Sequence, residues 1–239
     1  MPNWCECELV VRGGPLDLLN FVNTTLKHGL FAGVAPKPDD LVDKHAYGEG
    51  ELAYEAVFGD RTNASLLKRF EYLRVTDPDS RYDDIYGVSS YELLDLLFPG
   101  QSQEMLSLAE EYRTCLENTG HLNWYSWCMA NWGTKFPEQN LFTQEDYSPG
   151  TDESWTAYFD TAWSPPLEFL KRASGMYPEL TFRLSYHELL DWYAGYQEYR
   201  NGCMLNGLSG TPDQLNTEGK PLFPEAYRQL ERPELPSDS

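Results

Sequence analysis

Basic residues are scarce in this chain. Its 239 residues include 18 Lys and Arg against 38 Asp and Glu, which gives a formal net charge of −20 at pH 7. The segment from Phe136 to Leu170 contains seven acidic residues and no Lys or Arg. Because affinity for DNA and RNA rests on cationic contacts to phosphate, this composition disfavours direct binding to nucleic acid or to acidic membranes. A negative charge attracts basic protein surfaces. The same charge also serves simply to keep a protein in solution.

Long apolar runs and a secretion signal are also missing. No run of about 18 apolar residues occurs, so we expect no membrane-spanning helix. The first residues, MPNWCECELV, carry acidic side chains where a signal peptide needs basic ones, and they lack its apolar core. The five cysteines are an odd number and are thinly spread, which is typical of a reducing compartment. We therefore expect a cytoplasmic protein.

Complete catalytic and metal-binding motifs are missing as well. Cys5 and Cys7 form a Cys-x-Cys pair, but a tetrahedral zinc site needs four ligands and no second pair follows at ligand spacing. His187 and Glu188 are an alternative acid–base pair, although a surface turn fits the same residues. The chain contains no nucleophile elbow and no ordered set of Ser, His and Asp. The sequence therefore favours a protein without enzymatic activity, metal or cofactor.

Alternation of apolar and polar residues predicts a half-buried sheet. In the first strand, Cys5, Cys7, Leu9 and Val11 share one face. Further strands are expected over residues 132–136, 154–163, 179–186 and 192–200. Apolar residues at helical spacing predict helices over 64–74, 89–98 and 102–119, and two more that begin at Pro15 and Pro165. In this order the elements predict an α+β fold, a ferredoxin-like split β-α-β sheet with helices on one face and an α-rich insertion.

The predicted elements divide the chain into three parts. Residues 1–28 and 101–203 would form a discontinuous ferredoxin-like domain. Residues 29–100 begin with a proline-containing loop and continue with two short amphipathic helices, which indicates a helical insertion. Residues 204–239 are rich in proline and polar groups, which is typical of a loosely ordered tail.

Tryptophan is concentrated in the stretch NWYSWCMANWGTKF near the middle of the chain. Trp124, Trp127 and Asn131 would lie on one side of a short helix. We expect these tryptophans to pack with Trp132 and Trp163 between the helices and the sheet, since aromatic side chains supply much of the burial in a core. Some ring edges would reach the surface and serve as anchors for a partner.

The small turn Gly133-Thr134-Lys135 closes this stretch. Its backbone N–H groups and the Lys135 ammonium are a conceivable phosphate site. The turn lacks the spaced glycines of a phosphate loop, however, and it does not open a helix. We prefer a structural role, in which Lys135 pairs with Asp160 or another local carboxylate.

Three stretches of the chain resemble the YubB-type family of uncharacterised proteins. They are MPNWCECELVVRG, NWYSWCMANWGTKF, and FDTAWSPPLEFL followed by YPELTFRLSYHE. Members of this family are carried by enterobacterial plasmids and phages and are described as having a ferredoxin-like domain. The resemblance implies the same fold and an origin in a mobile element, but it supplies no reaction. The chain departs from the family pattern at Phe136-Pro137, where Trp-Asp is expected after the lysine.

These observations lead to a hypothesis about function. We expect a non-enzymatic, acidic protein-binding module of phage or plasmid origin in the host cytoplasm. Its partner would be a basic host protein, such as a nucleic-acid-binding or defence protein, which it would inhibit by imitating nucleic acid as a means of counter-defence. The contact residues would be the acids of the segment without cations: Glu145, Asp146, Asp152, Glu153 and Asp160.

Two alternatives stay open. The first is a small enzyme or nucleotide-binding protein with a cleft beside Trp132–Lys135. The second is a structural assembly protein that pairs through an exposed sheet edge.

Purified protein is expected to contain no stoichiometric zinc or iron, because four ligands at workable spacing are missing from the sequence. Elemental analysis of the purified chain checks this expectation. About one metal ion per chain would contradict it and would make Cys5 and Cys7 the first ligands to test.

Overall fold

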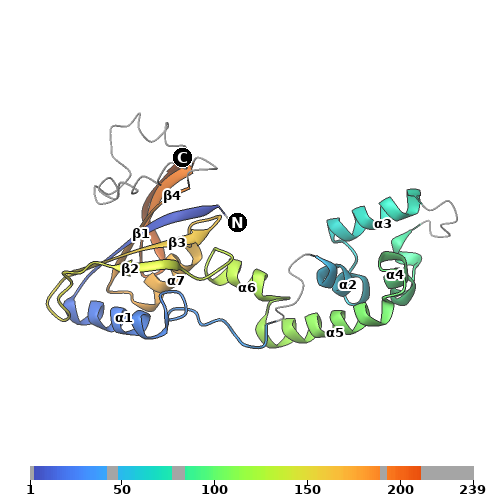
Figure 1. Ribbon diagram of the computed structural model, residues 1–239, viewed down its shortest axis with the longest axis horizontal. Helices are drawn as coiled ribbons and strands as arrows, with labels where there is room; N and C mark the ends of the chain where they lie inside the picture. The colour runs from blue at the N-terminus through green and yellow to red at the C-terminus, as the bar shows by residue number, and fades with distance from the viewer. Residues whose placement is uncertain (1–2, 42–47, 77–83, 189–192, 211–239) are drawn as a thin grey trace, which may run out of the picture. The chain divides into compact units, whose positions relative to one another are not determined.

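The computed structural model describes residues 3–41, 48–76, 84–188 and 193–210. It divides the chain into two compact units. Met1–Pro36 and Cys128–Ser239 form the first, which we call the sheet unit, and Lys37–Trp127 forms the second, which we call the helical unit. The described strands all belong to the sheet unit (Figure 1). Among the described helices, none is both long and apolar enough to cross a membrane.

The sheet unit is built on a six-stranded antiparallel sheet. Its elements in chain order are β1 (Trp4–Arg12), α1 (Pro15–His28), β2 (Gln139–Thr143), β3 (Ser154–Ala162), α7 (Leu167–Met176), β4 (Thr181–Glu188), β5 (Tyr193–Arg200) and β6 (Cys203–Gly210). The strand order is β2-β3-β1-β4-β5-β6. Thus β1-α1-β2 and β3-α7-β4 are two split β-α-β units, each holding one strand of the other between its own strands. The predicted α+β, ferredoxin-like fold is confirmed, and β5 and β6 extend the sheet beyond β4.

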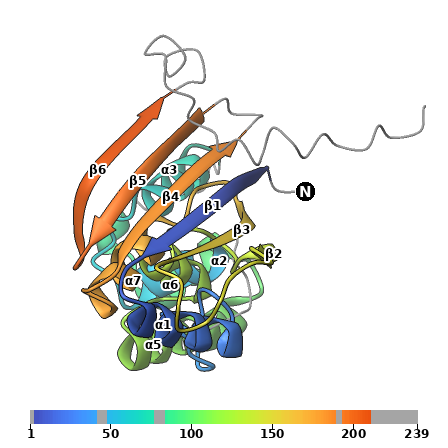
Figure 2. The same ribbon diagram turned by 90° about the vertical axis from the view of Figure 1, so that its left-hand side faces the viewer.

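One face of the sheet carries α1 and α7, and no described helix covers the other face (Figure 2). Cys5, Cys7, Leu9 and Val11 point toward the helices, and each is 0% exposed. On the same side, the following residues of β3, of β4 and of the segment just before β4 are also buried: Phe159, Leu180, Phe182 and Leu184. Arg183 lies on the opposite face and is half-buried. The alternation in the first strand therefore predicted its buried face correctly.

Phe21 joins α1 to the sheet. Its ring makes edge contacts with the rings of Trp155, Tyr177 and Phe182, at centroid distances of 5.7, 5.3 and 5.2 Å. These contacts come from β3, from β4 and from the segment before β4, so one side chain ties both β-α-β units together. Phe21 is fully buried.

The end of α1 is tied to the start of β2 by Glu138. One carboxylate oxygen of Glu138 accepts the N–H of Leu30 at 2.5 Å, and the other accepts the N–H of Phe31 at 3.1 Å. Burial raises the pKa of Glu138, and the backbone N–H groups partly offset that rise. The carboxylate thereby satisfies N–H groups that follow α1 and fixes the path of the chain into β2.

The helical unit has its own core. Its elements are α2 (Glu49–Val57), α3 (Ala64–Thr76), the 3₁₀ turn η1 (Ile85–Gly87), α4 (Ser90–Leu97) and α5 (Ser102–Thr119). Helix α6 (Trp124–Asn131) runs across the division between the units. Ser89 and Glu92 form a capping box at the start of α4. The Arg61 guanidinium donates to the carbonyl oxygens of Ile85 and Val88, both at 2.7 Å, and so holds η1 and the connection to α4.

Two predictions about element boundaries were wrong. Residues 132–136, expected to be a strand, form turns, because Gly133 has φ 80, a left-handed conformation that breaks a strand. The strand begins at Gln139 instead. The expected limits of the helical insertion, residues 29–100, and of the tail, residues 204–239, also differ from those in the structure. Helix α5 packs against α2 in the helical unit, and residues 204–210 belong to β6, while the rest of the expected tail lies outside the described residues.

Phe21→Ala is expected to lower the free energy of unfolding by about 3–5 kcal/mol, because it removes a fully buried ring and leaves a cavity. Leu26→Ala on the same helix is the matched control, since Leu26 is 60% exposed. Denaturant unfolding followed by tryptophan fluorescence measures both. Equal losses for the two variants would contradict the packing of α1 described above.

Candidate functional site

The connection between β2 and β3 presents most of the acids of the segment that lacks cations. We call residues 144–153 the acidic loop. Glu145, Asp146 and Glu153 are exposed, and Asp152 is half-buried. The two strands form an antiparallel hairpin, with Phe142 opposite Tyr158 and Thr143 opposite Ala157. The hairpin thus brings four of the five predicted contact residues into one loop.

Hydrogen bonds within the acidic loop fix its shape. The Asp152 carboxylate accepts the N–H of Ser148 at 2.7 Å, and the Ser148 carbonyl accepts the N–H groups of Thr151 and Asp152 at 3.2 and 3.1 Å. The Glu153 carbonyl accepts the N–H of Gly13 at 3.0 Å, which joins the loop to the end of β1. Asp152 therefore holds the loop in shape, whereas the carboxylates of Glu145, Asp146 and Glu153 face solvent.

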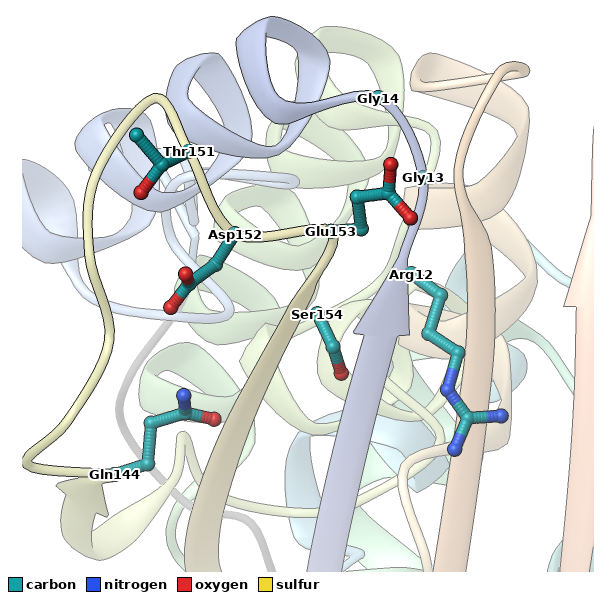
Figure 3. Close-up of a pocket in the computed structure, with 8 residues that line it drawn as sticks. All are labelled: Arg12, Gly13, Gly14, Gln144, Thr151, Asp152, Glu153 and Ser154. Carbon is teal, nitrogen blue, oxygen red and sulfur yellow. The ribbon is translucent and has the colours of Figure 1, made fainter.

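A shallow hollow of about 830 Å³ lies beside the acidic loop. Its lining residues are Arg12, Gly13, Gly14, Gln144, Thr151, Asp152, Glu153 and Ser154. Figure 3 shows Asp152 and Glu153 pointing in different directions from the loop backbone, and Arg12 extending from the end of β1. The walls combine one cation with carboxylates and hydroxyl groups, which suits a polar protein surface better than an apolar ligand pocket.

Asp160, the fifth predicted contact residue, lies elsewhere. It is in the half of β3 far from the acidic loop, opposite Glu6 of β1, and its carboxylate accepts the side-chain N–H of Asn140 at 2.7 Å. Burial raises the pKa of Asp160, the Glu6 carboxylate adds to the rise, and the Asn140 hydrogen bond and His187 oppose it. The strand predicted over residues 154–163 already implied this separation, because an extended strand carries Asp160 away from the loop acids.

His187 pairs with Glu6 and not with its neighbour Glu188. The distance from His187 Nε2 to Glu6 Oε2 is 3.2 Å. His187 and Glu188 are successive residues of β4, so their side chains point to opposite faces of the sheet. The two cannot act together as an acid–base pair, and His187 belongs to the row of polar groups on the uncovered face.

The tryptophans of the predicted cluster differ in burial. Trp127 and Trp132 are buried, at 6% and 3% exposed, Trp124 is half-buried, and Trp163 is 49% exposed. The prediction that all four pack in the core is therefore wrong for Trp163, and the half-buried Trp124 does not confirm it. Trp132 packs its ring against Phe31 and donates its indole N–H to the Ala35 carbonyl at 3.0 Å.

Trp163 has a strained backbone. Its φ of 70 lies in the left-handed region, which costs a residue with a side chain about 1–2 kcal/mol. The Trp163 N–H donates to the Asn3 carbonyl at 2.9 Å, and its carbonyl accepts the Tyr193 hydroxyl at 2.8 Å, so the residue before β1 and the first residue of β5 hold it in place. An exposed aromatic ring on a strained backbone is a second surface feature that the sequence pattern did not predict.

Polar groups of the Gly133-Thr134-Lys135 turn are bonded within the protein. The Thr134 hydroxyl is fully buried and donates to the Ala162 carbonyl at 2.9 Å, and the Gly133 carbonyl accepts the Ser164 hydroxyl at 2.8 Å. The Lys135 ammonium lies 5.1 Å from the centroid of the Phe136 ring. Asn131, just before the turn, is buried at 8% exposed. These contacts join the turn to the segment between β3 and α7.

The described side chains contain no group of three or more His, Cys, Asp or Glu residues placed to hold a metal ion. A second hollow, of about 410 Å³ in the helical unit, is lined by Asp40, Ser107, Glu110, Glu111, Thr114, Cys115 and Asn118. Both hollows are therefore lined by residues other than the Trp132–Lys135 turn.

The topology and the split β-α-β units make the sheet unit a ferredoxin-like α+β domain. Residues 140–217 match the family described as the ferredoxin-like domain in Api92-like protein. The crystal structure of the protein api92 from Yersinia pseudotuberculosis is similar over 88% of this chain and 98% of that chain, with 15% sequence identity and a TM-score of 0.40. A comparison with curated proteins finds no match. The description of the matched family names a ferredoxin-like domain and states no activity.

Trp132→Ala is expected to lower the free energy of unfolding by about 3–5 kcal/mol, because it removes a buried ring and leaves the Ala35 carbonyl without its donor. Trp163→Ala should cost clearly less, since about half of that side chain is in solvent. Parallel denaturant titrations compare the two variants. A larger loss for Trp163→Ala would contradict the assignment of Trp132 as the core residue and Trp163 as the surface residue.

Proposed function

We propose that the chain is a non-enzymatic protein-binding module that engages a basic protein through the acidic loop. The observation that carries this proposal is the arrangement of Glu145, Asp146 and Glu153. Their exposed carboxylates lie on one loop, which internal hydrogen bonds hold in shape, inside a segment without Lys or Arg. A loop that is already ordered loses little conformational entropy when it binds, so its charge is available for contact with a partner.

Electrostatics makes a basic partner the best fit. Exposed carboxylates speed the encounter with a positive surface, and this effect weakens as salt screens it. The net charge of −20 acts in the same direction over the whole chain. We therefore propose association that is fast at low salt and slower at high salt.

The resemblance of three sequence stretches to YubB-type proteins supports an origin in a phage or plasmid. In that setting the partner we propose is a nucleic-acid-binding host or defence protein, whose basic groove the acidic loop occupies in the host cytoplasm. Such binding would imitate nucleic acid and inhibit the host protein, which would serve counter-defence.

The bonds made by Thr134 and Gly133 favour this module over a nucleotide cleft beside Trp132–Lys135. A phosphate-binding turn must offer its polar groups to the ligand. Here two donors of the turn are already used within the protein: the Gly133 N–H donates to the Cys128 and Met129 carbonyls, and the Thr134 hydroxyl donates to the Ala162 carbonyl. The turn thus contributes to the stability of the sheet unit that carries the acidic loop.

Reversal of the three exposed loop acids, Glu145→Lys, Asp146→Lys and Glu153→Lys, is expected to abolish capture of the basic partner from host lysate and to slow association with that partner after its purification. Asp152 stays unchanged, because its carboxylate holds the loop in shape. Affinity capture followed by association-rate measurements at two salt concentrations tests both effects.

A second triple reversal is the matched control. Glu104, Glu110 and Glu111 of α5 are exposed, and their change to Lys alters the net charge by the same amount. This control should keep the partner and most of the association rate. Equal behaviour of the two triple variants would mean that total charge, and not the acidic loop, governs association, and it would overturn the proposal.

A further inference from the structure

Strand β2 is one edge of the sheet. The strand order places β3 on one side of β2 and no described strand on its other side. Just beyond β2, the Gln144 N–H donates to the Thr156 carbonyl of β3 at 3.1 Å. Because N–H groups alternate in direction along an antiparallel strand, the N–H of Thr143 points away from β3. The outer side of β2 therefore offers backbone hydrogen-bonding groups to another chain.

The sequence of β2 does little to block such pairing. Natural edge strands are usually protected by charged side chains, proline or a bulge. The five residues of β2, QNLFT, include no charged residue and no proline. A register shift does occur between Gln139 and Phe142, where Asn140 has φ 51, but the strand is regular from Phe142 onward. One end of the edge is thus protected, and the end next to the acidic loop is not.

Apolar side chains accompany this open edge. Leu141 is 36% exposed and Phe142 is 49% exposed. The Phe142 ring stacks on Tyr158 of β3, with a centroid distance of 4.9 Å and an interplanar angle of 18°. The stack supports Phe142 from the side of the sheet, so its free face forms a fixed apolar contact for whatever pairs with β2.

Carboxylates lie at both ends of β2. Asp160 is bonded to Asn140 at one end, and Glu145 and Asp146 follow Gln144 at the other. These acids all belong to the segment from Phe136 to Leu170, which contains no Lys or Arg. A strand added along this edge would therefore be attracted most strongly if it carried basic side chains.

We propose that β2 is the docking edge of the module, and that the partner contributes an extended basic segment that pairs with β2 as an additional strand. This inference rests on the proposed function and adds the binding mode and the chemistry of the partner. Backbone hydrogen bonds to the outer side of β2 would give affinity, and the flanking carboxylates would select Lys or Arg. The opposite edge, β6, also lacks charged residues, but beside it the Arg200 guanidinium is paired with the Glu179 carboxylate at 3.4 Å, so this pair adds no net attraction for a basic segment.

A labelled peptide of alternating lysine and valine is the probe, and a peptide of alternating glutamate and valine is its counterpart. The wild-type chain should bind the basic peptide and not the acidic one. Thr143→Pro should weaken binding by about tenfold, the equivalent of one lost hydrogen bond, because it removes the outward N–H. An edge strand tolerates proline where the N–H faces solvent, so the fold should persist. Thr143→Ala keeps the N–H and should bind more tightly than Thr143→Pro.

Amide hydrogen exchange gives a second readout on the unmodified chain. The Thr143 N–H should exchange quickly in the free protein and become protected when the basic peptide is added. The Gln144 N–H, already bonded to Thr156, should be protected in both states. The comparison of these two amides tests whether the peptide pairs with β2 even if Thr143→Pro fails to fold.

Three outcomes would overturn the inference. The first is no binding of the basic peptide to the wild-type chain. The second is binding of the basic peptide that leaves the exchange of the Thr143 N–H unchanged. If reversal of the loop acids then abolishes this binding, the acidic loop remains the binding surface, but without strand addition. The third is a concentration-dependent dimer in light scattering that Thr143→Pro dissolves, which would make a second copy of the chain the occupant of β2.

Discussion

The carboxylate of Glu138 is the contact on which the arrangement of the β2–β3 hairpin depends. It accepts the N–H groups of Leu30 and Phe31 and is half-buried, and burial raises its pKa. Since β2 begins one residue later, this acid sets the point at which the chain joins the sheet. The acids of the segment without cations thus have two different uses: Glu138 and Asp152 hold structure, while Glu145, Asp146 and Glu153 present charge.

The sheet separates stability from surface chemistry. The face toward α1 and α7 is buried and mostly apolar, with Phe21 packed against it, although Thr161 and Glu188 are also buried there. The uncovered face carries Glu6, Asp160 and His187 in one row across the strands. Hairpin β2–β3 lies at one edge of the sheet. Its loop is anchored to the end of β1 by the hydrogen bond from the Gly13 N–H to the Glu153 carbonyl, so an inner strand holds the loop while its exposed carboxylates take no part in the core.

The sequence pattern predicted the parts of the fold in which periodicity reports burial. Alternation along β1, β3 and β4 identified the core face, because each of these strands has a helix layer on one side only. It failed for β2, whose residues are mostly exposed on both faces and therefore show no alternation. It also failed for Trp163, since an aromatic residue held at positive φ has no signature in composition. The grouping of Glu145, Asp146 and Glu153 was predictable from the lack of cations, and the predicted strand over residues 154–163 already implied that Asp160 lies apart from them, whereas its position opposite Glu6 needed the strand register.

The weakness of the pattern in β2 and the suitability of that strand for binding have the same cause. A strand buried on one face must alternate, and its register and partners are then fixed by the core. β2 contributes little to the core, so its residues are free to be neutral, exposed and apolar at once. In a chain with a net charge of −20, a neutral edge flanked by carboxylates presents backbone groups beside a charge that attracts basic side chains. The two proposals therefore combine into one surface, in which the charge of the acidic loop would bring a partner close and the backbone of β2 would hold it.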